Sequence, residues 1–444
     1  MKIKLKKGLR LNLAGALPAN AVPKVVESKV YAVYPDDFPG FMPKVAVKEG
    51  DNVACGTELM HDKNHPDVCL VSPVAGKVKA VVRGDRRKVI RIEVEAGDSS
   101  AQKPEYKAPK NADDAKKVLA RSGMLALMRR RPYDIVPDPA DEVRDIFVTA
   151  FDEAPLAPGY EAFDGLFSAA DYQAGIDFLA KITKGKVYIS HKAGFRYGAM
   201  KGAEFVEVDG VYPASNVGVQ IANICPVDKG DTVWTLDFAT LGRIGHLANN
   251  GECDFRTVVA LVGPEVKTPV LAATTCGASI APIIEGRLDS GRNLRIISGN
   301  VFTGVAVSAD SFIRFPYRQI TVIAEGNDVD EFMGWASFAP SKMSESSSFP
   351  GHFLSKAFRP DARLNGGRRA MIVSGQYDRY MPMDILPEYL LKAIMSNNID
   401  DMEKLGIYEV APEDFAAAEY ADTSKLPLQQ IVRDGLDSLR KELE

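Results

Sequence analysis

Cysteine is scarce in this chain of 444 residues, and the five that occur are scattered: Cys55, Cys69, Cys225, Cys253 and Cys276. No two of them form a CxxC pair, and none follows Cys276. An iron–sulfur cluster needs about four thiolates, usually close together in the sequence. The spacing therefore argues against such a cluster, and it fits a reducing compartment.

Two other features are also missing, an excess of basic residues and a long apolar run. Lys and Arg total 55 against 59 for Asp and Glu, which argues against nucleic-acid binding. The longest uncharged window, 268–284, contains Pro269, Gly277 and Pro282 and is shorter than the roughly 20 apolar residues of a membrane span. We therefore expect any membrane association to go through a partner.

The amino terminus has the charge of a signal peptide but lacks its apolar stretch, because Gly15, Pro18 and Asn20 interrupt it. Lysines alternate there with Ile3 and Leu5. This alternation predicts an edge strand with a solvated lysine face.

A glycine-rich phosphate loop is absent from the region where it would be expected. Strand patterns at 145–150, 186–190 and 203–208, with a helix pattern at 170–181, predict a Rossmann-like α/β domain. No G-x-G-x-x-G spacing follows these strands, and Asp152 and Glu153 after the first would repel a phosphate. His191, after the second, has no His, Cys or acidic partner at a metal-ligand spacing. We predict neither nucleotide nor metal binding by this chain.

Short apolar-alternating strands separated by glycine turns fill residues 40–97 and predict a small flattened β-barrel. The pattern resembles the biotinyl/lipoyl carrier fold, or barrel-sandwich hybrid. In that fold the modified lysine follows an acidic residue at a hairpin tip, and Asp62 and Lys63 fall near that place. Pro66 would stiffen the turn, so an unmodified Lys63 remains the alternative.

The segment 128–133 combines Arg129, Arg130 and Arg131 with Tyr133 just after Pro132. Arginine can donate paired hydrogen bonds to a carbonyl or carboxylate, and tyrosine offers a stacking face. The alternative is a basic helix C-terminus that complements its own dipole before the proline.

Several longer phrases are distinctive, and together they resemble the A subunit of the bacterial Na⁺-translocating NADH:quinone reductase over nearly the whole chain. They lie at 122–133, 146–152, 212–221, 233–236, 261–267, 295–301, 369–371 and 381–385. The family is similar to the C subunit of the Rnf complex and to the flavin subunit of complex I. The resemblance implies a multidomain α/β protein with four parts: a barrel-sandwich domain at 1–100, a Rossmann-like domain at 101–254, a β-grasp (SLBB-like) domain at 255–328 and a mainly helical domain at 329–444.

The same resemblance implies a peripheral subunit on the cytoplasmic face of the bacterial inner membrane, docked onto a membrane subunit of a sodium-pumping complex. FAD, FMN, riboflavin and an iron–sulfur centre are then expected in partner subunits, with none held by this chain. The family commonly has a Cys-Pro pair near its C-terminal end, whereas this chain has Tyr420 to Ser424 there. A role of that thiol does not carry over.

Three functions remain open at this point. The chain contributes to a quinone site through Arg129, Arg131 and Tyr133, or it only assembles the complex, or it is a carrier modified at Lys63. A polar, serine-rich stretch at 341–348 predicts a loop.

Overall fold

The central sheet of the molecule is built from alternating strands and helices. The computed structural model describes residues 1–163, 165–289, 291–327 and 356–443, together with 345, 349 and 353. Six strands lie in the order β1-β13-β12-β11-β14-β10, and only β10 is antiparallel to its neighbour. Their bounds are Lys2–Lys4 (β1), Arg129–Arg131 (β10), Asp145–Thr149 (β11), Val187–His191 (β12), Glu204–Asp209 (β13) and Val233–Asp237 (β14).

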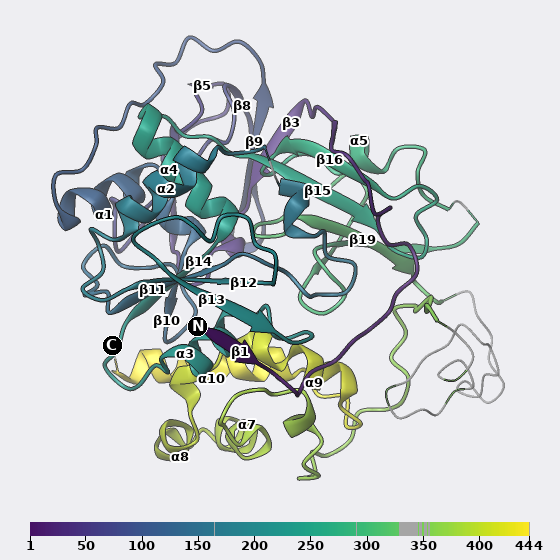
Figure 1. The fold of residues 1–444 in the computed structure, drawn as a ribbon. Coiled ribbons are helices and arrows are strands. Elements are labelled where there is room, and N and C mark those ends of the chain that lie inside the picture. The colour runs from purple at the N-terminus through teal and green to yellow at the C-terminus, as the bar shows by residue number, and fades with distance from the viewer. Residues whose placement is uncertain are drawn as a thin grey trace.

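Helices cover both faces of this sheet, as crossover connections between parallel strands require. α2 and α4 lie together on one face and α3 lies on the other (Figure 1). The helices are Ala112–Arg121 (α1), Ala169–Leu179 (α2), Val217–Ile224 (α3) and Phe238–Asn250 (α4). The prediction of an α/β domain with these strands is confirmed, and the helix predicted at 170–181 is α2 at Ala169–Leu179.

The segment 128–133 is not the end of a helix, and this part of the sequence interpretation is wrong. Only the short 3₁₀ turn η3 (Leu125–Leu127) precedes it, and Met128 already has extended backbone. Arg129 to Arg131 then pair with Val233 to Thr235 of β14 as an antiparallel edge strand. Strand pairing outweighs local propensity here because β14 offers an open edge.

The predicted barrel consists of two small antiparallel sheets, β3-β9-β8-β5 and β4-β6-β7. Their strands are Val30–Val33 (β3), Pro43–Val45 (β4), Asn52–Val53 (β5), Glu58–Asp62 (β6), Cys69–Val71 (β7), Gly76–Arg83 (β8) and Val89–Ala96 (β9). The predicted barrel is thereby confirmed.

A second six-stranded sheet has the order β18-β17-β19-β15-β16-β2, and five of its strands lie within residues 255–328, where a β-grasp part was predicted. The bounds are Lys24–Val25 (β2), Arg256–Val262 (β15), Val270–Thr275 (β16), Leu294–Ser298 (β17), Val305–Val307 (β18) and Gln319–Ala324 (β19), with the short helix Ala281–Ile284 (α5).

The first 25 residues contain two short strands, β1 and β2, that belong to sheets outside the barrel. β1 is the predicted edge strand: Ile3 is buried against Val206 and Val208, while Lys2 and Lys4 are exposed. β2 pairs with β16. Two strands inside 1–100 therefore pair elsewhere, and the predicted domain boundaries stay predictions.

The C-terminal helices pack below the central sheet (Figure 1). They are Pro387–Met395 (α7), Ile399–Lys404 (α8), Ala416–Ala421 (α9) and Leu428–Leu443 (α10). One core joins them to Tyr133, Ile135 and Tyr212 of the α/β part.

The other 3₁₀ turns are Pro35–Asp37 (η1), Asp85–Arg87 (η2), Tyr160–Phe163 (η4), Tyr377–Arg379 (η5), Ile407–Glu409 (η6) and Pro412–Phe415 (η7). The loop predicted at 341–348 lies, apart from Glu345, outside the described residues.

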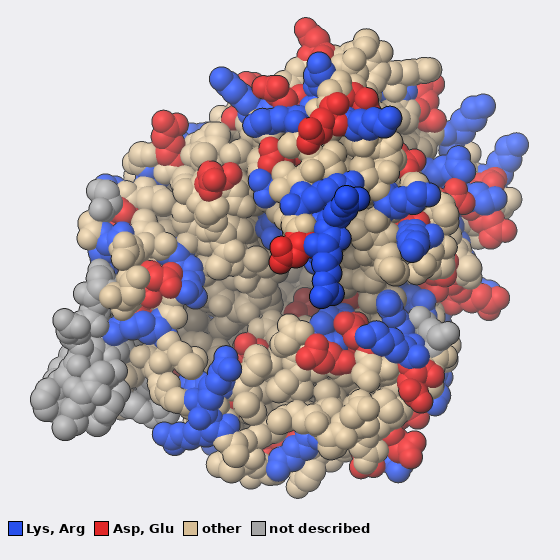
Figure 2. All heavy atoms as spheres, turned by 180° about the vertical axis from the view of Figure 1, so that it is seen from behind, with Lys and Arg blue, Asp and Glu red and all other residues tan. Residues whose placement is uncertain are grey.

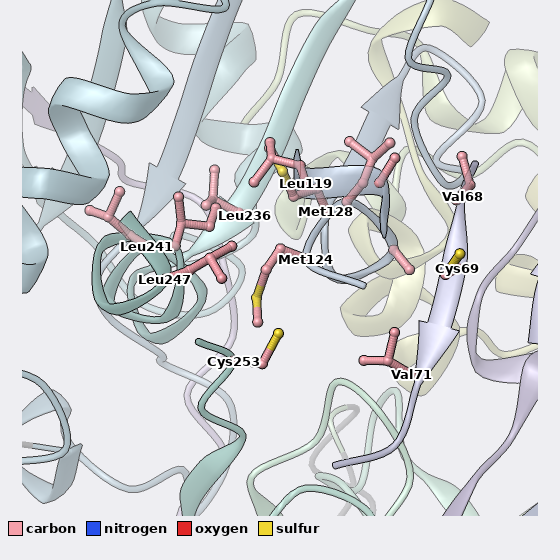
Figure 3. Close-up of a cluster of buried hydrophobic side chains, with 14 of the residues drawn as sticks. Val68, Cys69, Val71, Leu119, Met124, Met128, Leu236, Leu241, Leu247 and Cys253 are labelled. Carbon is pink, nitrogen blue, oxygen red and sulfur yellow. The ribbon is translucent and has the colours of Figure 1, made fainter. Parts of the chain in front are cut away.

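The barrel and the α/β part share one hydrophobic core (Figure 3). Val68, Cys69 and Val71 approach it from the barrel, and Leu119 and Met124 are fully buried on the other side. Burial of such side chains contributes roughly 1.5–3 kcal/mol each. This shared core joins the two parts and fixes the walls of the site described next.

Within the described residues, no helix has the length and apolar character needed to cross a bilayer.

Candidate functional site

A cavity of about 540 Å³ lies at the carboxyl ends of β11 and β14. From β11 the chain continues to β12 and then β13, which lie on one side of β11 in the sheet. The next strand, β14, lies on the other side of β11, so the connections run in opposite directions from the edges of β11 and β14 that face each other. Ligands of open α/β sheets bind in the crevice that such a divergence creates. Residues 149–152 and 235–238 supply the sheet side of the wall, and residues 314–319 of the β-grasp part supply the opposite side.

The surface seen from behind is hollowed near its centre, and basic and acidic side chains lie around the hollow (Figure 2). Acidic groups outnumber basic ones in the wall of the cavity itself. Four arginines (129, 131, 314 and 318) line it against six carboxylates (Asp36, Asp37, Asp134, Asp152, Asp237 and Glu413).

The N-termini of both helices at the cavity already hold carboxylates of this chain. Asp237 caps α4 and accepts a hydrogen bond from the Thr240 backbone N–H at 2.7 Å. Asp414 lies against the first turn of α3, where a Cβ on Gly218 would collide with its carboxylate. Helix N-termini are where phosphates bind in nucleotide-binding folds. Carboxylates occupy both positions here.

Arg318 lies at the centre of the contact between the β-grasp part and the sheet. Its guanidinium forms an ion pair with Asp237 and lies 5.0 Å from the centre of the Phe163 ring. The side chain remains 22% exposed, and burial lowers its pKa to about 10, so it stays cationic near neutral pH. Sequence reasoning missed Arg318. Its signal was the run 314–318, in which two arginines flank Phe315, Pro316 and Tyr317.

Arg314 connects this segment to the barrel. It donates from Nε to Asp37 Oδ1 at 2.7 Å, and the Phe315 backbone N–H donates to Oδ2 at 2.9 Å. Burial raises the pKa of Asp37, and the hydrogen bond from Arg314 opposes that rise. The Phe315 ring stacks on Phe38 with centroids 5.1 Å apart. A smaller, mainly apolar cavity of about 70 Å³ is also lined by residues 314–318.

Two of the three residues predicted from the sequence line the large cavity. Arg129 hydrogen-bonds the backbone oxygen of Asp37 at 2.9 Å and lies 5.5 Å from the centre of the Phe315 ring. Arg131, 2% exposed, is paired with Glu413. Tyr133 is buried in the core of the C-terminal helices and is not among the residues that line the cavity.

Lys63 lies where the carrier hypothesis places it, at the exposed turn between β6 and β7. Asp62 is buried and anchors the turn. It accepts backbone hydrogen bonds from Met42 at 2.6 Å, Asn64 at 2.7 Å and His65 at 3.0 Å. Asp62 therefore has a structural task of its own in this turn.

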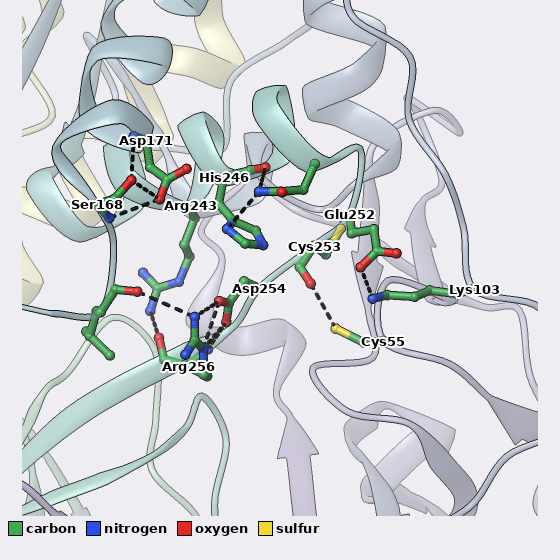
Figure 4. Close-up of polar contacts among 12 residues, drawn as sticks. Cys55, Lys103, Ser168, Asp171, Arg243, His246, Glu252, Cys253, Asp254 and Arg256 are labelled. Carbon is green, nitrogen blue, oxygen red and sulfur yellow. Dashed lines mark hydrogen bonds and ion pairs between the residues drawn. The ribbon is translucent and has the colours of Figure 1, made fainter.

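Polar contacts also join the barrel to the end of α4 (Figure 4). The Cys55 thiol donates to the Cys253 carbonyl oxygen at 3.4 Å, and Lys103 pairs with Glu252.

His191 contacts the Lys192 carbonyl and stacks on Phe195. Across the described ranges, no three His, Cys, Asp or Glu side chains gather in a way that could hold a metal ion.

Comparison with known protein families shows which class of protein this chain is similar to. Residues 3–97 match the NqrA N-terminal barrel-sandwich hybrid domain, residues 110–253 the NqrA second alpha/beta domain and residues 258–309 the NQRA C-terminal domain. The order of these parts agrees with the barrel, the α/β sheet and the second sheet described above.

Curated relatives match along the whole chain. The A subunit of the Na⁺-translocating NADH-quinone reductase of Serratia proteamaculans is 36% identical over 99% of this chain and 100% of its own length. The corresponding proteins of Yersinia pseudotuberculosis and Haemophilus influenzae are 34% and 33% identical with the same coverage. This chain belongs to the family of the A subunits of Na⁺-translocating NADH-quinone reductase.

Proposed function

We propose that this chain is the peripheral A subunit of a sodium-pumping NADH-quinone reductase and that its large cavity receives the headgroup of a quinone. The observation that supports its place in the complex is the 36% identity over 99% of the chain to a protein of that name. On this proposal NADH oxidation, the flavins and the iron–sulfur centre belong to partner subunits. The chain docks onto a membrane subunit from the cytoplasmic side.

The chemistry of the cavity supports a neutral ligand with hydrogen-bond acceptors. Carboxylates at the N-termini of α3 and α4 would repel a phosphate, whereas they do not oppose an uncharged quinone. Arg318 is the donor suited to a quinone carbonyl, whereas Arg129 already donates to three backbone carbonyls and shapes the wall. The ring of Phe315, stacked on Phe38, adds an aromatic group to the lining. The adjoining apolar cavity would take the start of an isoprenoid tail.

The place in the complex is tested by affinity purification of the tagged chain from native membranes in mild detergent. We expect NADH-quinone reductase activity that Na⁺ stimulates to purify with it. Recovery of the chain alone, from membranes in which that activity is present, would contradict the proposal.

The quinone site is tested by equilibrium binding of a short-chain quinone to the isolated protein. A hydrogen bond from a charged donor contributes about 1.5–3 kcal/mol, so Arg318→Gln should weaken binding about 10- to 150-fold. Arg318→Lys, which keeps the charge next to Asp237, should retain part of the affinity. Arg256→Gln is the matched control because Arg256 pairs with Asp254 outside the cavity.

Quinone binding and the intact mass of the protein test the two other functions. A purely structural role is favoured by the ion pairs that already engage Arg131, and it predicts no quinone binding by native protein. A carrier modified at Lys63 predicts a discrete mass increment in protein from the native source, absent from Lys63→Arg. We expect the unmodified mass.

A further inference from the structure

Two segments far apart in the sequence are strongly basic. Residues 1–14 contain five basic and no acidic side chains, and residues 356–380 contain six basic and two acidic ones. These 39 residues carry a net charge of +9 in a chain whose total is −4. The rest of the protein is therefore acidic.

The fold holds the two segments side by side. The Gly8 backbone N–H donates to the Arg379 carbonyl at 2.9 Å. Asn12 and Ala14 exchange backbone hydrogen bonds with Phe358 at 2.9 and 2.8 Å. The N-terminal segment accordingly runs along the coil that leads to the C-terminal helices (Figure 1).

Six exposed bases of these segments define what we name the basic surface. None of the six forms an ion pair with any residue that the structure describes. They are Lys6, Lys7, Arg10, Arg368, Arg369 and Arg379. Neighbouring bases differ in this respect, since Lys2 pairs with Glu207 and Arg359 with Glu265. The six charges can therefore meet an external partner.

Exposed aliphatic side chains lie on the same segment as Arg368 and Arg369. Leu364 is 60% exposed and Ile372 is 63% exposed. The segment has little regular structure, yet it is anchored. The Arg369 N–H donates to the Ser424 carbonyl at 2.9 Å, and Glu388 accepts from the backbone of Ser374 at 2.8 Å.

We propose that the basic surface, with Leu364 and Ile372 beside it, binds the anionic headgroups of a lipid bilayer. Clustered Lys and Arg are attracted to anionic lipid, and aliphatic side chains beside them insert at the headgroup boundary. A bilayer presents a broad negative plane that can meet dispersed cations on two segments at once. An acidic protein segment would not require the exposed aliphatic side chains. Direct contact with lipid would replace the expectation from the sequence that membrane association goes only through a partner, and it does not depend on the quinone site or on assembly with other subunits.

The test is flotation of the purified full-length chain with vesicles of phosphatidylcholine, with and without phosphatidylglycerol. We expect binding only with phosphatidylglycerol, and loss of that binding as the salt concentration rises from about 0.05 to about 0.5 M. Each base near the surface contributes about a fivefold factor, so Arg368→Glu/Arg369→Glu should weaken partitioning by at least about 25-fold. Ile372→Ser should weaken it without changing the salt dependence.

Arg86→Glu/Arg87→Glu is the matched control. It makes the same change of charge at two exposed arginines in the hairpin between β8 and β9. Binding of this control at the native level supports the proposal. Absence of native binding to phosphatidylglycerol vesicles, or an equal loss in the control, overturns it. Equal binding to vesicles with and without phosphatidylglycerol would also overturn it, because the charge of the lipid would then play no part. No quinone or partner subunit is present, so the outcome is separate from that of the proposed function.

Discussion

Arg131 of β10 donates from Nη2 to Glu413 Oε1 at 3.1 Å, across 282 residues of sequence. Arg131 Nη1 also lies 3.7 Å from a carboxylate oxygen of Asp414, which is fully buried. The contact joins the edge of the central sheet to the segment before α9. Removing one partner of such a cluster leaves the other charges uncompensated.

Arg131→Ala should therefore lower the free energy of unfolding by about 3–5 kcal/mol, as the loss of one partner of a buried ion pair does. Denaturant unfolding monitored by tryptophan fluorescence measures it, since Trp234 lies on the neighbouring strand β14. Lys184→Ala, which breaks the exposed ion pair with Glu142, should change the stability by less than about 1 kcal/mol. Equal effects of the two variants would show that the Arg131 cluster is not a structural link.

Glu413 should make stability depend on pH. Burial raises its pKa above the ordinary 4.5, Arg131 opposes the rise and Asp414 adds to it. An acid with a higher pKa in the folded state binds more protons when folded, so its contribution is present at low pH and is lost as pH rises above 4.5. Because the side chain is 40% exposed, solvent moderates the effect.

Glu413→Gln removes this titration and keeps a hydrogen-bond acceptor for Arg131. Thermal unfolding from pH 5 to 9 should show the variant gaining stability relative to the native protein as pH rises. A constant difference across that range would contradict the assignment.

The close packing of α2 on α4 depends on glycine. A Cβ on Gly245 would overlap the carbonyl oxygen of Asp171, which is backbone and cannot rotate away. Gly245→Ala should cost about 1–3 kcal/mol or more, because the helices must separate. Gly97→Ala, with no atom within 4 Å of its added Cβ, should stay within about 0.5 kcal/mol of native. Similar midpoints for both variants in thermal unfolding would contradict this account.

The thiols at the junction of the barrel and the α/β part should be unreactive in the folded protein. Burial raises the pKa of Cys55, Cys69 and Cys253 to about 12 each. At pH 8 the thiolate fraction is then on the order of 10⁻⁴, and the thiolate is the reacting species. Iodoacetamide labelling followed by mass spectrometry should modify these three only after unfolding. Rapid labelling of Cys55 in native protein would show that the junction opens.

The sequence predicted elements wherever local periodicity dominates. The edge strand at Lys2–Lys4 and the strands of the α/β part follow from the alternation of apolar and polar residues. Prediction failed at Arg129 to Arg131, where a short polar run became a strand because β14 had an unpaired edge. Pairing with a distant strand leaves no periodic signal in so short a run.

What the sequence determined by itself is the set of elements and the lack of a glycine-rich phosphate loop, since both depend on neighbouring residues. The tertiary structure alone decided that Arg318 pairs with Asp237 at the cavity wall, and that Arg131 rather than a solvent-facing base meets Glu413. It also placed residues 1–14 beside 356–380 and so gathered their charge. Each of these contacts joins residues tens to hundreds of positions apart, and such proximity follows from the packing of whole elements.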